Sequence, residues 1–163
     1  MDVGGGASLL VDRLLDRGFT NLAVMDVSAR ALSLARERLG ERSRTVRWIE
    51  ADVRQPTLPL SSVDLWHDRA VFHFLTGTDD KRAYVEHMGQ ALRAGGHAVI
   101  ATFALDGPPK CSGLEVSRYS PSNLAEALGG GFELLRSAER THTTPAGRDQ
   151  RFTYTLFRKR EPE

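Results

Sequence analysis

Short runs of apolar residues alternate along this chain with stretches whose apolar residues recur every three to four positions. The first such stretch, over 10–17, places its apolar residues on one helical face and stops before Gly18, which predicts an amphipathic helix. An apolar run at 22–25 then predicts a buried strand that ends at Asp26. Strands that alternate with helices in this way are typical of βαβ units in a parallel sheet.

The same alternation continues through most of the chain. Ser28 is of the residue type that caps helices, and it precedes an apolar helical face that ends at Gly40. Ser120-Pro121 has the cap-then-proline pattern that begins a later helix. Further strands are predicted at 46–49, 63–66 and 98–103, and further helices at 70–75 and from Asp79-Asp80 to 92, with a loop at 105–117.

The C-terminal part follows a different pattern. Two strand-like segments, 132–142 and 151–158, flank a turn that contains Pro145, Ala146 and Gly147, and such a short connection joins antiparallel strands. We therefore predict an α/β fold. It is a Rossmann-like, mostly parallel, seven-stranded sheet with helices on both faces and an antiparallel C-terminal hairpin.

Composition narrows the classes of partner. The 163 residues carry 22 basic and 21 acidic side chains, so there is no electrostatic reason to expect nucleic acid or an anionic membrane. No apolar run approaches the roughly 20 residues of a membrane helix, and the N-terminus lacks a signal-peptide pattern. Cys111 is the sole cysteine, which favours a reducing compartment and gives no zinc-site pattern. We expect a cytoplasmic protein without a metal site.

Glycines and acidic residues follow the predicted strands, at the edge where parallel sheets bind ligands. Gly4-Gly5-Gly6 permits a tight turn into a helix whose free N–H groups can face a ligand. Asp26 lies 20 residues after Gly6, the spacing at which an acidic residue accepts the ribose hydroxyls of an adenosine. Asp52 ends the third strand, where it can accept the exocyclic amine of adenine beside Val53. Helix capping is the alternative role for Asp26.

The segment from Asp2 to Gly6 resembles the first motif of class I S-adenosylmethionine-dependent methyltransferases, in which an acidic residue precedes Gly-x-Gly. Ser8 stands where that family often has a third glycine. The resemblance implies that Asp2 lies near the amino group of the cofactor, S-adenosyl-L-methionine. It covers nearly all of 1–163, which we expect to form a single cofactor-binding methyltransferase domain.

The same resemblance assigns the remaining cofactor-binding residues. It implies that Gly4, Gly5 and Gly6 approach the cofactor closely. It also implies that Asp26, with the adjoining Val27, holds the ribose. Asp52 and Val53 match the adenine position of the family.

A narrower resemblance begins at Trp66-His67-Asp68-Arg69-Ala70, which looks like the Trp-Asp-Arg-Gly segment of thiopurine methyltransferases with one inserted or shifted residue. It implies that Arg69 contacts the cofactor's carboxylate and borders the acceptor pocket, whereas helix capping or pairing with Asp68 is the alternative. The implied reaction is an in-line SN2 transfer of a methyl group to a small molecule, which mainly requires positioning. Asp68, His67 and His73 are the candidates for a general base, and Asp68 is expected to face the site best.

Two other classes of function stay open. A NAD(P)-dependent oxidoreductase has a similar sheet, although its fingerprint requires a glycine where Leu9 stands. A non-catalytic cofactor-binding protein of the same fold is the second alternative.

The second alternative draws on the first strand, which has only Met1-Asp2-Val3 before the glycines. Class I methyltransferases normally carry a helical cap before this strand. We therefore expect an N-terminally truncated domain in which a partner or a second copy of the chain covers the gap.

Overall fold

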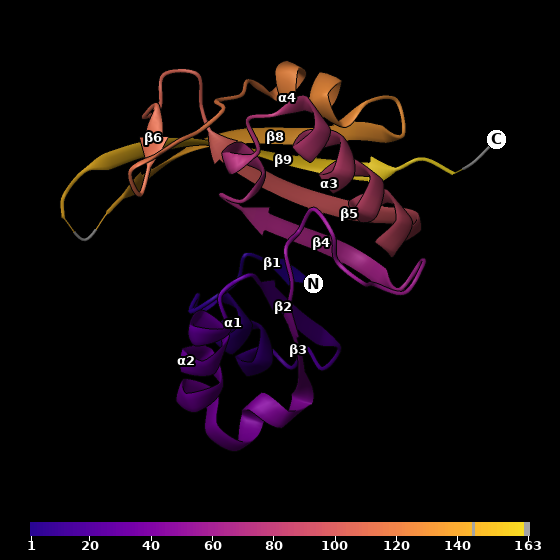
Figure 1. Cartoon of the computed structure of the whole chain (residues 1–163), viewed down its shortest axis with the longest axis vertical. Coiled ribbons are helices and arrows are strands. Elements are labelled where there is room, and N and C mark those ends of the chain that lie inside the picture. The colour runs from indigo at the N-terminus through magenta and orange to yellow at the C-terminus, as the bar shows by residue number, and fades with distance from the viewer. Residues whose placement is uncertain (145, 162–163) are drawn as a thin grey trace.

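The computed structural model describes residues 1–144 and 146–161 and contains a seven-stranded sheet in the order β3-β2-β1-β4-β5-β9-β8 (Figure 1). Its strands are β1 (Asp2–Val3), β2 (Leu22–Asp26), β3 (Val46–Glu50), β4 (Val63–Arg69), β5 (Leu92–Phe103), β8 (Phe132–Thr143) and β9 (Asp149–Lys159). The five strands from β3 to β5 in this order are parallel. Strand β9 runs antiparallel to both β5 and β8. The predicted fold class is confirmed.

Helices lie on both sides of the sheet. The first pair is α1 (Leu10–Asp16) and α2 (Ala29–Leu39), followed by the 3-10 helix η1 (Gly40–Thr45). The second pair is α3 (Thr78–Ala91) and α4 (Pro121–Leu128). Figure 1 shows α1 and α2 beside β1–β3, whereas α3 and α4 lie across β5, β8 and β9. We name the two sides of the sheet the α1/α2 face and the α3/α4 face.

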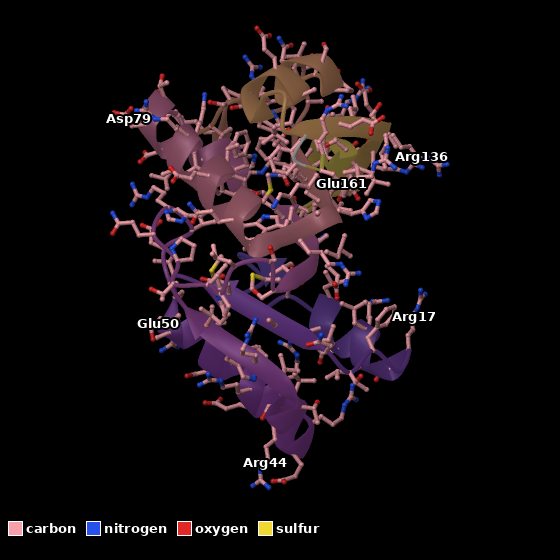
Figure 2. All side chains as sticks on the ribbon, turned by 90° about the vertical axis from the view of Figure 1, so that its right-hand side faces the viewer. Arg17, Arg44, Glu50, Asp79, Arg136 and Glu161 are labelled. Carbon is pink, nitrogen blue, oxygen red and sulfur yellow. The ribbon has the colours of Figure 1, made fainter. Side chains whose placement is uncertain are left out.

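Alternation along each strand divides the apolar residues between these two faces. On the α3/α4 face, Trp66, Ile100 and Phe157 are completely buried in the main core. On the α1/α2 face, Val24 packs with residues of both helices, including Val11. Labelled charged side chains such as Arg17, Arg44 and Asp79 lie at the periphery, as Figure 2 shows, whereas Asp2 and Asp68 are buried. No helix in the described ranges is long and apolar enough to cross a membrane.

The predicted helix caps are confirmed. The Ser28 side chain accepts a hydrogen bond from the Ala31 N–H at 3.2 Å, and Ser120 does the same for Asn123 at 3.2 Å. Each contact satisfies one of the N–H groups that a helix leaves free at its start.

Several boundaries differ from the prediction. Strand β4 continues past Trp66 to Arg69, because its last residues pair with Ile100 and Ala101. Strand β5 begins at Leu92 rather than 98, since the Gly95-Gly96 segment forms an irregularity inside the strand and not a turn before it.

Two predicted connections also differ. The helix expected at 70–75 is only a 3-10 turn, η2 (Phe72–Phe74). The loop expected at 105–117 contains a small hairpin of β6 (Lys110–Cys111) and β7 (Leu114–Glu115). Pro145 of the predicted hairpin turn lies outside the described residues.

Candidate functional site

The glycine loop joins β1 to α1 at the carboxyl edge of the sheet. The Gly4 N–H donates to the Met25 carbonyl at 2.7 Å, which anchors the loop on β2. A side chain at Gly4 would place its Cβ 2.1 Å from Val71 Cγ2, and one at Gly6 would lie 2.8 Å from Asp26 Oδ2. Both residues also have positive φ angles, of 64° and 40°. Space and backbone conformation therefore both require glycine at these positions.

Two backbone donors lie where the glycine loop turns toward α1. Among the described residues, the N–H groups of Gly6 and Ala7 donate no hydrogen bond to another backbone group. The Ser8 hydroxyl accepts from the Leu10 N–H at 3.1 Å. This hydrogen bond satisfies one of the N–H groups that have no partner within the helix at the start of α1. Free N–H groups at a strand-to-helix turn are the donors that nucleotide-like ligands use.

Arg38 of α2 clamps the far end of the loop. Its guanidinium donates to the carbonyls of Ala7 at 3.1 Å and Ser8 at 2.8 Å, and it also forms a bidentate pair with Asp12 at 3.0 and 2.7 Å. The pair holds the pKa of the Asp12 carboxyl below its ordinary value, mainly through these hydrogen bonds. The sequence analysis missed Arg38, because nothing local indicates that an arginine in the next helix reaches this loop.

Asp26 lies at the end of β2, and its two carboxylate oxygens have different neighbours. Its Oδ1 accepts from the Ser28 N–H at 2.8 Å, whereas the cap of α2 is Ser28, so Asp26 fixes the residue before the helix and does not cap the helix itself. Its Oδ2 lies beside Gly6, at the predicted ribose position. The next residue, Val27, is 72% exposed and presents an apolar side chain at the same edge.

Asp52 follows β3 and is already engaged by a basic side chain. Arg54 Nη2 lies 2.6 Å from Asp52 Oδ2, and Arg54 Nε lies 3.0 Å from Oδ1. Arg54 also reaches Asp80 of α3 at 3.2 Å. These contacts lower the pKa of the Asp52 carboxyl. Val53 is half-buried against the main core, and Arg54 is a residue that the sequence analysis missed.

Asp2 and His67 form a pair across neighbouring strands. They stand opposite each other in the β1–β4 register, and Asp2 Oδ1 lies 2.7 Å from His67 Nδ1. Because a carboxylate only accepts hydrogen bonds, Nδ1 carries the proton. A Cβ on Gly5 would lie 2.5 Å from Asp2 Oδ2, so the carboxylate lies against the glycine loop.

Asp68 does not face the site, and this expectation was wrong. Its side chain is completely buried. It accepts hydrogen bonds from the N–H groups of Val71 at 2.8 Å and Phe72 at 3.0 Å and from the Tyr84 hydroxyl at 2.7 Å. Burial raises the pKa of Asp68 to about 6, although these donors oppose the shift. Asp68 therefore holds the turn after β4, and the Tyr84 hydroxyl is in turn bound by Trp66 Nε1 at 2.9 Å.

His73 is also completely buried, so it has no surface with which to act as an exposed base. Its Nδ1 accepts from the Phe103 N–H at 3.4 Å, at the part of β5 that extends beyond β4. Desolvation lowers the pKa of His73 to about 4. The ring therefore stays neutral and completes the edge of β5.

Arg69 is exposed at the end of β4 but leans away from the glycine loop. Its guanidinium lies 5.4 Å from the centre of the Phe152 ring on β9, two strands beyond β4. The structure thus groups Asp2, Gly5, Gly6 and Asp26 around one loop, whereas the Arg69 side chain extends from β4 toward Phe152 of β9.

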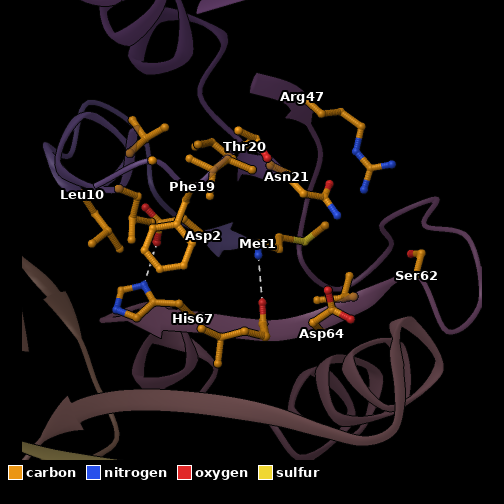
Figure 3. Close-up of a pocket in the computed structure, with 18 residues that line it drawn as sticks. Met1, Asp2, Leu10, Phe19, Thr20, Asn21, Arg47, Ser62, Asp64 and His67 are labelled. Atoms are coloured by element: carbon orange, nitrogen blue, oxygen red, sulfur yellow. Dashed lines mark hydrogen bonds and ion pairs between the residues drawn. The ribbon is translucent and has the colours of Figure 1, made fainter. Parts of the chain in front are cut away.

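Asp2 and His67 also line a cavity that extends from the glycine-loop side to the amino ends of β2 and β4, beside α1 (Figure 3). It has a volume of about 530 Å³, and Phe19, Leu10, Asp64 and Arg47 are among the residues that line it. Ligands of parallel sheets bind at the carboxyl edge, so we place the candidate site at the glycine loop and not in the amino-end part of this cavity. In the described ranges no three His, Cys, Asp or Glu side chains are grouped to hold a metal ion.

Solved structures share this fold. A SAM-dependent methyltransferase from Methanosarcina mazei superposes with a TM-score of 0.79 at 12% identity, covering 99% of this chain and 92% of that one. The N-methyltransferase NodS from Bradyrhizobium japonicum, solved with S-adenosyl-L-homocysteine, gives 0.74 at 18% identity, covering 98% and 76%.

Sequence comparison defines the family. An uncharacterized methyltransferase of Mycobacterium tuberculosis is 29% identical over 103 residues, which are 63% of this chain and 49% of that protein. This chain thus spans about half the length of the curated relatives that it matches. The profile of the methyltransferase domain family matches residues 1–98. The chain belongs to this methyltransferase domain family.

Proposed function

We propose that this chain binds S-adenosyl-L-methionine at the glycine loop and transfers its methyl group to a small molecule. The observation that carries the proposal is the loop itself. The N–H groups of Gly6 and Ala7 donate to no backbone acceptor in the described ranges, and the carboxylates of Asp2 and Asp26 lie beside Gly5 and Gly6 of the same loop. Donors and acceptors at one turn suit a ligand that has an adenosine and an amino acid part.

Different residues at the carboxyl edge of the sheet contact different parts of the cofactor in this proposal. Asp26 Oδ2 has no protein donor in the described ranges and can accept a ribose hydroxyl, while exposed Val27 offers an apolar contact. Asp2 supplies a carboxylate for the amino group of the cofactor. Asp52 can accept a hydrogen bond from the adenine amine while Arg54 also donates to its oxygens, because a carboxylate has about four acceptor positions.

The cofactor supplies an electrophilic methyl group, so the protein's main task is to position the acceptor for in-line attack. Of the three candidate bases, only His67 retains exposed surface, at 24% of its side chain. His67 and Arg69 lie on the same face of β4, because alternate residues of a strand point the same way. We therefore infer that an acceptor approaches over this side of β4.

The substrate class rests on similarity to small-molecule enzymes. NodS is named an N-methyltransferase, and a Burkholderia thailandensis neighbour with a TM-score of 0.74 is a 1,6-didemethyltoxoflavin N1-methyltransferase bound to its small acceptor. We further propose that 1–163 form one domain. The cytoplasmic location and the partner or second copy over the first strand stay predictions of the sequence.

One neighbour supports a second candidate function. SpnF, named a [4+2]-cyclase, has this fold with a TM-score of 0.77. The fold therefore also occurs in a protein named for a different reaction, and a chain that binds the cofactor without transferring its methyl group is the alternative.

Calorimetric titration separates these functions. We expect S-adenosyl-L-methionine to bind and NADH not to bind. Asp26→Ala should weaken binding by roughly tenfold or more, since a hydrogen bond to a charged group contributes about 1.5–3 kcal/mol. Asp16→Ala, at an exposed acid of α1, is the matched control. Binding of NADH alone, or an unchanged affinity in Asp26→Ala, would overturn the assignment. Binding without methyl transfer to any of a panel of small amines, thiols and phenols would favour the non-catalytic alternative.

A further inference from the structure

We propose that Tyr84 of helix α3 is a positioning residue for the glycine loop, and that it acts through Asp68 and the side chain of Val71. Tyr84 is completely buried in the main core on the α3/α4 face, so it cannot touch a ligand itself. That the loop holds the cofactor rests on the proposed function, whereas the contacts that position the loop do not.

Val71 follows β4 and packs against the glycine loop. Its Cγ2 methyl group lies 2.1 Å from the place that a Cβ of Gly4 would take, so it fills the space of the missing side chain. The Gly4 N–H also donates to the Met25 carbonyl of β2 at 2.7 Å. Strand β1 lies between β2 and β4 in the sheet. The loop after β1 is therefore held by a hydrogen bond to one neighbouring strand and by an apolar contact from the turn after the other.

The turn that carries Val71 depends on one carboxylate. The Ala70 N–H donates to the Ala101 carbonyl at 2.9 Å and continues the pairing of β4 with β5. The next two N–H groups, of Val71 and Phe72, instead donate to the Asp68 carboxylate at 2.8 and 3.0 Å. The place of Val71 is therefore set by the orientation and the charge of Asp68.

Tyr84 controls both properties of Asp68. Its hydroxyl donates to Asp68 Oδ2 at 2.7 Å and accepts from Trp66 Nε1 at 2.9 Å, so the indole directs the single hydroxyl proton toward the carboxylate. Burial raises the pKa of Asp68 to about 6, and the Tyr84 hydroxyl opposes this shift more than the two N–H groups of the turn or the charge of His67 do. Without the hydroxyl, more of the carboxyl is protonated at neutral pH. A protonated oxygen donates a hydrogen bond and no longer holds the turn.

Removal of the Tyr84 hydroxyl tests this role. We expect Tyr84→Phe to weaken the binding of S-adenosyl-L-methionine by roughly fivefold or more in calorimetry at neutral pH, and to speed amide hydrogen exchange at 4–8. Tyr119→Phe is the matched control. Tyr119 is also buried and also packs on Phe72, with 5.5 Å between the ring centres, but its hydroxyl has no hydrogen-bond partner among the described residues. The control should leave both measurements unchanged.

A second pair of variants separates positioning from a general loss of packing. Val71→Ala removes the contact with Gly4, and Val85→Ala makes the same change at another half-buried valine of the main core. We expect only Val71→Ala to weaken binding. The double variant Tyr84→Phe/Val71→Ala should bind about as weakly as the weaker single variant, because both changes act through one contact. Losses that multiply in the double variant would overturn the inference.

The pH profile gives a readout that a purely structural tyrosine would not change. The ratio of the dissociation constants of Tyr84→Phe and the wild type should be largest at about pH 7 and should shrink toward about pH 5, where Asp68 holds a proton in both proteins. A ratio that is independent of pH would assign Tyr84 to packing alone and overturn the positioning role.

Two further outcomes keep this inference apart from the proposed function. If the wild type binds no S-adenosyl-L-methionine, the proposed function fails, and hydrogen exchange alone decides on Tyr84: equal exchange at 4–8 in Tyr84→Phe and Tyr119→Phe overturns its role. Circular dichroism melting identifies the variants that fold. If Tyr84→Phe does not fold, the comparison of Val71→Ala with Val85→Ala decides, and equal binding and exchange in these two would overturn the inference.

Discussion

The carboxylate of Asp2 and the imidazole of His67, 2.7 Å apart, link the glycine loop to the strand that follows it in the sheet. Asp2 is 7% exposed and touches the loop at Gly5. We assign Asp2 to the cofactor, and the orientation of its carboxylate depends on His67. The sequence had indicated His67 only as a candidate base. His67 can act by positioning Asp2 as well as by meeting an acceptor.

Replacement of His67 by phenylalanine should separate these two roles. The Asp2 carboxylate would lose its side-chain partner in a buried position, and we expect a loss of about 1–3 kcal/mol in the free energy of unfolding. Cofactor affinity should fall as well. Urea unfolding and calorimetry measure the two effects. His142→Phe, at an exposed position of β8, is the control. Wild-type affinity in His67→Phe would show that Asp2 does not need this partner.

Arg38→Ala should loosen the glycine loop. The variant removes two hydrogen bonds to loop carbonyls and the bidentate pair with Asp12, and we expect about 1–2 kcal/mol lower stability. Amide hydrogen exchange at 7–10 should become faster. Arg42→Ala breaks a more exposed pair with Asp16 and should change stability little. Equal effects in the two variants would contradict a specific role for Arg38.

Sequence patterns predicted the glycine loop and Asp26 because their spacing follows from the order of strand, turn and helix. They predicted the wrong environment for Asp68, because the predicted strand ends at Trp66 whereas β4 continues to Arg69. Side chains two residues apart share a face of a strand, so a longer strand would have placed Asp68 inward beside buried Trp66. Arg38 was beyond reach, since its contacts join segments about 30 residues apart that only the folded chain brings together. Arg54 lies only two residues after Asp52, close enough in sequence for the two side chains to pair, but the family motif includes only the acidic residue.

Asp68 should make the protein less stable as pH rises. Its pKa is about 6 in the folded protein, above the ordinary 3.8, so between these values the folded state holds a proton that the unfolded state has released. The free energy of unfolding then falls from about pH 4 to 6, by on the order of 3 kcal/mol. Asp68→Asn lacks this dependence. Urea unfolding of both proteins at pH 4.5 and 7 compares them, and a constant difference between them would contradict the assignment.

His73 should have the opposite effect. Its pKa is about 4 when folded and 6.5 ordinarily, so the unfolded state gains a proton first as pH falls. Stability is therefore lost between about pH 6.5 and 4, again by on the order of 3 kcal/mol. His73→Phe removes this loss, and its unfolding free energy should rise relative to wild type as the pH falls. Parallel pH profiles for the two proteins would show that folding does not lower the pKa of His73.

Ala70 occupies a backbone conformation that suits glycine. Its φ is +70°, and the segment that it ends resembles one that has glycine there. A left-handed conformation costs a residue with a Cβ about 1–2 kcal/mol, whereas glycine loses about 0.5–1 kcal/mol more entropy on folding. Ala70→Gly should therefore stabilise the protein by about 0.5 kcal/mol. Ala94, an exposed alanine without a positive φ, gives the matched control: Ala94→Gly should lower stability by about 0.5–1 kcal/mol. Urea unfolding of the two variants with the wild type decides the sign, and a loss in Ala70→Gly as large as that in Ala94→Gly would mean that the turn after β4 is not strained.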